Sequence, residues 1–204
     1  CILIAKELKQ YEQKACESAA VTFVELPVAY DAITVVVNAR NTWASTITVP
    51  ELRALWDAAA EKKVTTWKQV RAEWPDREIR LFGPGVESGT FDYFTEAVVG
   101  KAKASRGDYT ASEDDNTLVQ GIANDKHALG YIPYAYYEPN KKRLKAVAVD
   151  GGHGPVLPSR ETVESGAYQP LSRPMFIYVN SKSAAKAEVK RFVEFYLAQA
   201  PTLV

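Results

Sequence analysis

Hydrophobic and polar positions along the chain follow two spacings, one typical of strands and one typical of helices. Runs rich in β-branched residues predict strands at 21–26, 32–38, 78–82, 129–132, 144–149 and 175–179. Apolar residues that recur every three or four positions predict helices at 2–16, 49–59, 67–70, 90–99, 117–122, 159–165 and 184–199. Strands that alternate with helices in this way indicate an α/β fold with largely parallel pairing.

Local signals mark where two of the predicted helices begin. Thr48 and Glu51 have the spacing of a capping box, in which each side chain bonds the backbone of the other. Asp114 and Asp115 precede an apolar helical stripe, and negative charge is favourable at a helix start. The three consecutive valines within 32–38 predict a strand that is buried on both faces.

The segment Gly-Pro-Gly-Val-Glu-Ser-Gly-Thr, residues 83–90, lies between the predicted strand 78–82 and the predicted helix 90–99. Gly83 and Gly85 are expected to supply backbone angles that other residues resist. The segment lacks the Gly-Lys-Ser/Thr of a Walker loop and the Gly-x-Ser-x-Gly of a nucleophile elbow.

The helix start at the end of this segment is a candidate oxyanion site. The first amides of a helix have no acceptor inside the helix, and the helix dipole favours an anion there. Ser88 and Thr90 add hydroxyl groups, and Gly89 leaves room for a ligand to approach the backbone. The alternative is a tight turn in which Ser88 serves only as the N-cap.

The amino-acid composition is typical of a globular protein and does not favour binding to nucleic acid or to a membrane. Hydrophobic residues make up 47% of the chain and charged residues 25%, which is ordinary for a globular protein. Lys and Arg together number 25, as do Asp and Glu, so no net charge attracts nucleic acid or a membrane. No transmembrane run and no signal peptide is present, which indicates a cytosolic protein or a processed chain.

The two cysteines, Cys1 and Cys16, are too few for a disulfide framework. A pair between them in an oxidising compartment and two separate thiols remain alternatives, and a lipid anchor at Cys1 is a third reading. No cluster of Cys and His indicates a metal site, and no cofactor is expected.

Residues 82–94 resemble the ligand loop of phosphate-specific ABC-transporter substrate-binding proteins. Four further segments are similar to the same family in the same order, at 26–32, 108–116, 130–137 and 168–174. Five ordered matches that span most of the chain are more specific than one glycine-rich loop.

The resemblance implies a type II periplasmic-binding-protein fold, in which two α/β lobes joined by two crossing strands close on phosphate. The expected crossings are near 32–38 and 144–150. One lobe is then 38–145, and the other combines 1–37 with 146–204. The family also has an earlier segment with its own phosphate loop and carboxylate, which nothing here matches, so one lobe is expected to be incomplete.

The resemblance also implies a set of ligand contacts. They are Ser88, Gly89, Thr90, Arg106 and Asn116. Some relatives carry an arginine four residues before the serine, where this chain has Pro84, and Arg106 is the expected substitute. The alternatives are a surface arginine at 106 and a helix cap at Asn116.

The implied function is capture of inorganic phosphate by lobe closure and delivery to ABC permease subunits, in the periplasm or at the outer face of the cell envelope. A monomer is expected, with no nucleic acid, no membrane insertion and no enzymatic activity. One alternative is a hydrolase with Ser88 as nucleophile, although the spacing of His127 and His153 does not indicate a base for it. The other alternative is an anion-sensing regulatory domain.

Overall fold

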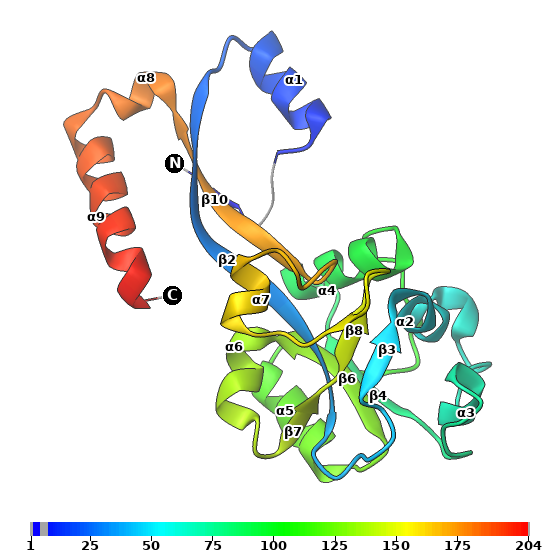
Figure 1. Cartoon of the computed structure of the whole chain (residues 1–204). Coiled ribbons are helices and arrows are strands. Elements are labelled where there is room, and N and C mark those ends of the chain that lie inside the picture. The colour runs from blue at the N-terminus through cyan, green and yellow to red at the C-terminus, as the bar shows by residue number, and fades with distance from the viewer. Residues whose placement is uncertain (1, 5–7, 204) are drawn as a thin grey trace. The chain divides into compact units, whose positions relative to one another are not determined.

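The computed structural model describes residues 2–4 and 8–203 (Figure 1). In chain order its elements are β1 (Ile2–Ile4), α1 (Gln10–Ser18), β2 (Phe23–Asn38), β3 (Thr46–Thr48), α2 (Val49–Trp56), η1 (Ala58–Ala60), α3 (Trp67–Val70), β4 (Arg80–Pro84), α4 (Gly89–Phe94), η2 (Thr95–Val99), β5 (Thr110–Ser112), α5 (Asp115–Asn124), β6 (Ala128–Pro133), α6 (Tyr134–Tyr137), η3 (Glu138–Asn140), β7 (Leu144–Ala146), β8 (Ala148–Asp150), β9 (Pro155–Val156), α7 (Arg160–Glu164), β10 (Ser172–Asn180), α8 (Ser181–Ala184) and α9 (Ala187–Leu203). The predicted α/β class is confirmed.

The chain divides into two compact units. The central unit is Ala32–Ser172, and the terminal unit combines Cys1–Asp31 with Arg173–Val204. The lobes predicted from the sequence, 38–145 and 1–37 with 146–204, stay a prediction. The boundaries of the compact units fall after residues 31 and 172, whereas the predicted boundaries fall after residues 37 and 145.

Segment 146–172 belongs to the central unit because its backbone and side chains bond there. Val147 N–H donates to Val35 O at 2.9 Å. The buried Tyr168 hydroxyl donates to Ile33 O, also at 2.9 Å. In addition, β8 pairs parallel with β3. These long-range bonds have no signature in the local sequence.

The strands of the central unit pair in both directions. The second half of β2 pairs antiparallel with β6 and β7, whereas β4 pairs parallel with β5 and β6. A second sheet holds β3 parallel to β8 and β8 antiparallel to β9. The expectation of largely parallel pairing is therefore correct only for strands linked by helical crossovers, such as β4 and β5 around α4.

The hydrophobic core lies on both faces of β2 in the central unit. Val35 and Val37 belong to one buried cluster, which includes Trp56 of α2. Val36 belongs to a second cluster with Leu118 of α5. The predicted burial of this strand on both faces is confirmed, and each fully buried side chain contributes about 1.5–3 kcal/mol.

In the terminal unit, β1 pairs antiparallel with β10, and β10 runs beside the first half of β2 (Figure 1). The predicted helix over 2–16 is wrong at its start, because Ile2–Ile4 form β1, and is confirmed only from Gln10. The two strands predicted at 21–26 and 32–38 are one strand, because Pro27 fits extended backbone and does not end it.

Two other sequence-based expectations concern the membrane and the cysteines. Across residues 2–4 and 8–203, no helix has the length and apolar character needed to cross a bilayer. Cys16 is half-buried on α1. Cys1 lies outside the described residues, so the Cys1–Cys16 pair and the lipid anchor stay predictions.

Candidate anion-binding site

The loop that follows β4 leads directly into α4. Ser88 is the N-cap of that helix and has extended backbone angles. Its Oγ accepts a hydrogen bond from Thr90 N–H at 3.1 Å. The cap that the sequence analysis held as an alternative is therefore present, and it leaves the hydroxyl proton of Ser88 available to donate.

The first two glycines of the loop pack closely against other side chains and do not have unusual backbone angles. A Cβ on Gly83 would lie 2.9 Å from Cε1 of Tyr131, and a Cβ on Gly85 would lie 2.0 Å from Oε1 of Glu113. Neither glycine has positive φ, so the expectation of special angles is wrong. A Cβ on Gly89 would meet nothing within 4 Å, which agrees with the expected room at that position.

The start of α4 lies at the surface of the central unit. Gly89 is exposed, and Ser88 and Thr90 are half-buried. Ser88 N–H closes the turn by donating to Gly85 O at 3.1 Å, whereas Gly89 N–H has no acceptor among the described residues. The groups open to a ligand here are the Gly89 amide and two hydroxyls.

Arg106 serves the interior of the central unit. Its side chain is 3% exposed, and Nη1 donates to Leu55 O at 3.0 Å and Val64 O at 2.9 Å. Leu55 lies in the last turn of α2, where a cation is favourable. The surface alternative is wrong, and because these bonds occupy the guanidinium, we leave Arg106 out of the ligand contacts proposed below.

Asp108 is the charge partner of Arg106. Arg106 Nε donates to Asp108 Oδ1 at 2.5 Å and Nη2 to Oδ2 at 2.9 Å. The hydrogen bond from Arg106 lowers the pKa of Asp108 to about 2, against the opposing effect of burial. This pair was not predicted from the sequence, although the Arg-x-Asp spacing was an available signal.

Asn116 lies in the exposed first turn of α5. The cap of that helix is Asp114, whose Oδ1 accepts from Asn116 N–H at 2.9 Å. Asp114 is thus confirmed as a cap residue, and the cap alternative for Asn116 is wrong. Burial and the charges of Asp114 and Glu113 raise the pKa of Asp115.

Two further side chains reach the loop. Glu113 Oε1 accepts from Glu87 N–H at 3.3 Å. The Tyr109 hydroxyl donates to Pro84 O at 2.9 Å. Both residues flank β5, which pairs with β4 through Pro84 and Ser112. Both residues lie in the segment 108–116 that resembles the family, and neither was predicted to contact the loop.

Metal and nucleophile chemistry find little support in the described part of the chain. No group of three or more His, Cys, Asp or Glu side chains there is arranged to hold a metal ion. His127 lies beside Asp125 at 3.9 Å and against the ring of Trp43. His153 is exposed. Across the described residues, neither histidine bonds Ser88.

Comparison with known proteins agrees with the resemblance in the sequence. A family profile described as a PBP superfamily domain matches residues 2–200. Protein SphX of Synechocystis sp. is 55% identical over 96% of this chain and 59% of its own length. The phosphate-binding protein PstS of Staphylococcus haemolyticus is 34% identical over 95% of this chain and 59% of its own length. The chain thus spans less than two thirds of these relatives.

The chain is also similar to solved structures of proteins described as phosphate-binding. A possible phosphate binding protein from Planctomyces limnophilus has a TM-score of 0.86 at 46% identity, over 95% of this chain and 68% of its own. A candidate phosphate ABC transporter substrate-binding protein from Clostridium perfringens, solved with bound phosphate, has a TM-score of 0.68 at 25% identity. That match covers 95% of this chain and 70% of the other.

Proposed function

The chain belongs to the PBP superfamily, and from that membership and the open helix start at Ser88–Thr90 we propose that the protein binds inorganic phosphate. The proposal depends on two findings that point to the same ligand. An accessible helix start bears a Ser-Gly-Thr sequence, and the chain is similar over almost its whole length to proteins named for phosphate binding.

The chemistry of this helix start suits a tetrahedral oxyanion. Phosphate is strongly hydrated, so its water must be replaced by hydrogen-bond donors. Ser88 and Thr90 offer hydroxyl groups, and the Gly89 amide adds a donor at the positive end of the α4 dipole. We propose these three residues as the contacts of this lobe. Asn116 stays in the proposal as a further amide donor.

The central unit is proposed to supply only part of the ligand shell. Both curated relatives extend well beyond the aligned region. We therefore assign high-affinity binding to a form extended to the length of those relatives, and weak or no binding to the 204-residue chain.

Delivery to ABC permease subunits follows from the same proposal. The Clostridium perfringens relative is described as an ABC-transporter substrate-binding protein. By analogy the protein acts as a monomer in the periplasm or at the outer face of the envelope, and it engages neither nucleic acid nor the bilayer interior. The net charge of zero agrees with a ligand held by a local site.

A hydrolase that uses Ser88 as nucleophile is the contrasting function, and the geometry supports it less. Activation of a serine needs a general base within hydrogen-bond reach. In the described structure, Ser88 Oγ instead accepts from a backbone amide. Turnover of a chromogenic phosphate ester that disappears in Ser88→Ala would establish the enzyme and overturn the binding proposal.

Calorimetric titration of phosphate into the extended form tests the assignment. We expect Thr90→Val to weaken binding about 10- to 150-fold, because one hydrogen bond to a charged ligand is lost. Thr110→Val is the matched control, since Thr110 lies on exposed β5 and keeps the α4 start intact. Unchanged affinity in Thr90→Val would remove Thr90 from the site.

A further inference from the structure

We infer that Glu113 is a positioning residue for the anion loop, and that a side chain at Gly85 would displace the Glu113 carboxylate from the place it occupies. The loop is defined as residues 85–88, between β4 and α4. The structural part of this inference is independent of phosphate binding. The step from loop shape to affinity rests on the function proposed above.

The steric evidence is specific to one pair of residues. A Cβ on Gly85 would lie 2.0 Å from Oε1 and 2.7 Å from Cδ of Glu113, and the third nearest atom, at 3.5 Å, is Glu113 Cγ. Real Cβ contacts are essentially never shorter than 3.0 Å. Since Gly85 has no positive φ, its backbone angles permit alanine. A side chain at 85 would therefore displace the flexible end of the Glu113 side chain.

The Glu113 carboxylate and the Tyr109 hydroxyl each form a hydrogen bond with the backbone around the loop. Glu113 Oε1 accepts from Glu87 N–H at 3.3 Å, one residue before the helix cap. On the other side of the loop, Tyr109 donates to Pro84 O at 2.9 Å. Burial, followed by the charge of Glu113, raises the pKa of Tyr109, which keeps this hydroxyl a donor.

A third contact joins the loop to the segment that contains Glu113, where β4 pairs with β5. Gly85 N–H donates to Ser112 O at 3.2 Å, and Glu113 follows Ser112 directly. The loop is thus held by three contacts from one short segment of chain. Ser88 is left to cap α4, and Gly89 N–H is left open to a ligand.

Amide hydrogen exchange of the 204-residue chain tests the structural part. We expect Glu113→Ala to speed exchange at Glu87 about two- to tenfold, because one modest hydrogen bond is lost. Gly85→Ala should give the same increase by displacing the carboxylate. The double variant should be no faster than Glu113→Ala alone, since residues in direct contact are not additive.

Two control variants separate the effect of the acceptor position at residue 113 from the effect of negative charge near the loop. Glu113→Gln keeps an acceptor at the same place and should exchange close to the wild type. Glu87→Gln removes one charge from the same loop, leaves the Glu113 carboxylate in place and should also leave exchange unchanged. Additive effects of Gly85→Ala and Glu113→Ala, or unaltered exchange in Glu113→Ala, would overturn the inference.

Phosphate titration of the extended form tests the functional step. Glu113→Gln and Glu113→Ala both lack the charge, so their ratio of affinities reports loop position alone. We expect the alanine variant to bind about two- to tenfold more weakly than the glutamine variant. Equal affinities would overturn this step. A wild-type protein that binds no phosphate would reject the proposed function, and the exchange experiment would still decide the role of Glu113.

Discussion

At the scale of single residues, buried charge in the central unit is matched by a carboxylate and by backbone carbonyls. Arg106 is almost fully buried, and Asp108 and two carbonyl oxygens accept hydrogen bonds from its guanidinium. Lys62 N–H donates to Asp108 at 2.9 Å, which adds to the stabilisation of the charged carboxylate. Removal of one partner from such a pair leaves the other charge uncompensated.

We expect Asp108→Asn to lower the free energy of unfolding by about 1 kcal/mol at pH 7, less than the full pKa shift would give, because solvent screens this exposed carboxylate. The folded-state pKa of Asp108, about 2, lies below its usual value of 3.8. This contribution is therefore fully present above about pH 4 and is lost as the pH falls through 2. Urea unfolding at several pH values should show wild type and variant converging in acid.

The control for this prediction is Asp76→Asn, because Asp76 is an exposed carboxyl in the turn before β4. It should leave the free energy of unfolding within about 0.5 kcal/mol of the wild type. A difference between wild type and Asp108→Asn that stays constant from pH 7 to pH 2 would contradict the assigned cause.

Residue roles were predictable from sequence only where the partner is close along the chain. Ser88 as a cap of α4 and Asp114 as a cap of α5 bond amides two residues away. The partners of Arg106 include Leu55 and Val64, and the close neighbour of Gly85 is Glu113. Such partners are chosen by the folded chain, so no local pattern reports them.

At the scale of elements, the start of α2 is held by a capping box and an ion pair. Glu51 N–H donates to Thr48 Oγ1 at 3.2 Å, and Thr48 N–H donates to Glu51 Oε2 at 2.8 Å. Arg71 donates to both oxygens of Glu51, at 2.9 and 2.7 Å. Burial tends to raise the pKa of Glu51, but the bonds from Arg71 and Thr48 outweigh it and lower the pKa.

We expect Thr48→Ala to lower the free energy of unfolding by about 1 kcal/mol, since the amide of Glu51 loses its acceptor. Thr48→Ser keeps a hydroxyl at the same place and should recover most of that loss. Thermal or urea unfolding measures both variants. Equal stability of the alanine and serine variants would show that the cap contributes little here.

The end of η2 gives a second test at this scale. Gly100 ends that helix with φ of 90°, in the left-handed region that favours glycine. A Cβ there would meet nothing within 4 Å, so Gly100→Ala tests backbone strain alone, with an expected cost of about 1 kcal/mol. Gly107 has no positive φ, so Gly107→Ala is the control and should be neutral.

Helices with caps and apolar stripes were predictable, and strands were less so. The predicted capping box of α2 and the apolar face of α5 are confirmed. The predicted interruption of β2 and the helical start of the chain are wrong, because β10 supplies the pairing that extends these strands. A strand depends on partners that are distant in sequence, whereas a helix satisfies most of its own backbone.

At the scale of the whole molecule, buried apolar side chains are concentrated in the central unit. Both hydrophobic clusters lie there. In the terminal unit, α9 leaves Phe192 and Phe195 exposed by 55% and 65%. An apolar hollow of about 140 Å³ lies where α9 meets β2 and β10, lined by Val24, Leu26, Val179, Val189 and Val193 among others. Local stability should therefore be lowest in the terminal unit.

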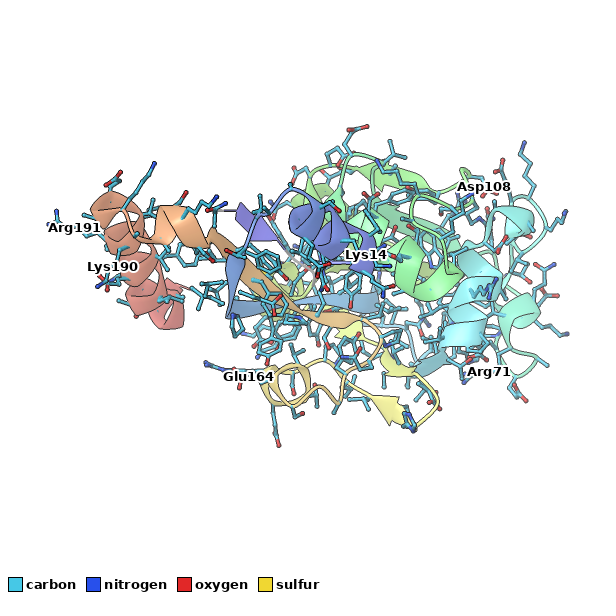
Figure 2. The ribbon with its side chains drawn as sticks, turned by 90° about the horizontal axis from the view of Figure 1, so that it is seen from above. Lys14, Arg71, Asp108, Glu164, Lys190 and Arg191 are labelled. Atoms are coloured by element: carbon cyan, nitrogen blue, oxygen red, sulfur yellow. The ribbon has the colours of Figure 1, made fainter. Side chains whose placement is uncertain are left out.

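Limited trypsin digestion of the 204-residue chain tests this difference. Lys190 and Arg191 are exposed on α9, and their side chains project from the helix (Figure 2). We expect early cleavage there, because opening of α9 exposes little buried apolar surface.

Arg71 of the central unit provides the internal comparison. It is paired with Glu51, and its guanidinium lies 4.6 Å from the centre of the Trp74 ring. Cleavage at Arg71 requires that unit to open, so a resistant fragment that contains 32–172 should persist after α9 is lost. Its ends should lie close to residues 15 and 182, because Lys14 and Lys182 are the nearest basic residues outside the unit that trypsin can use. Mass spectrometry of the time course would identify the fragments. Cleavage after Arg71 as early as after Arg191 would show that the two units unfold together, and that the concentration of core residues does not set local stability.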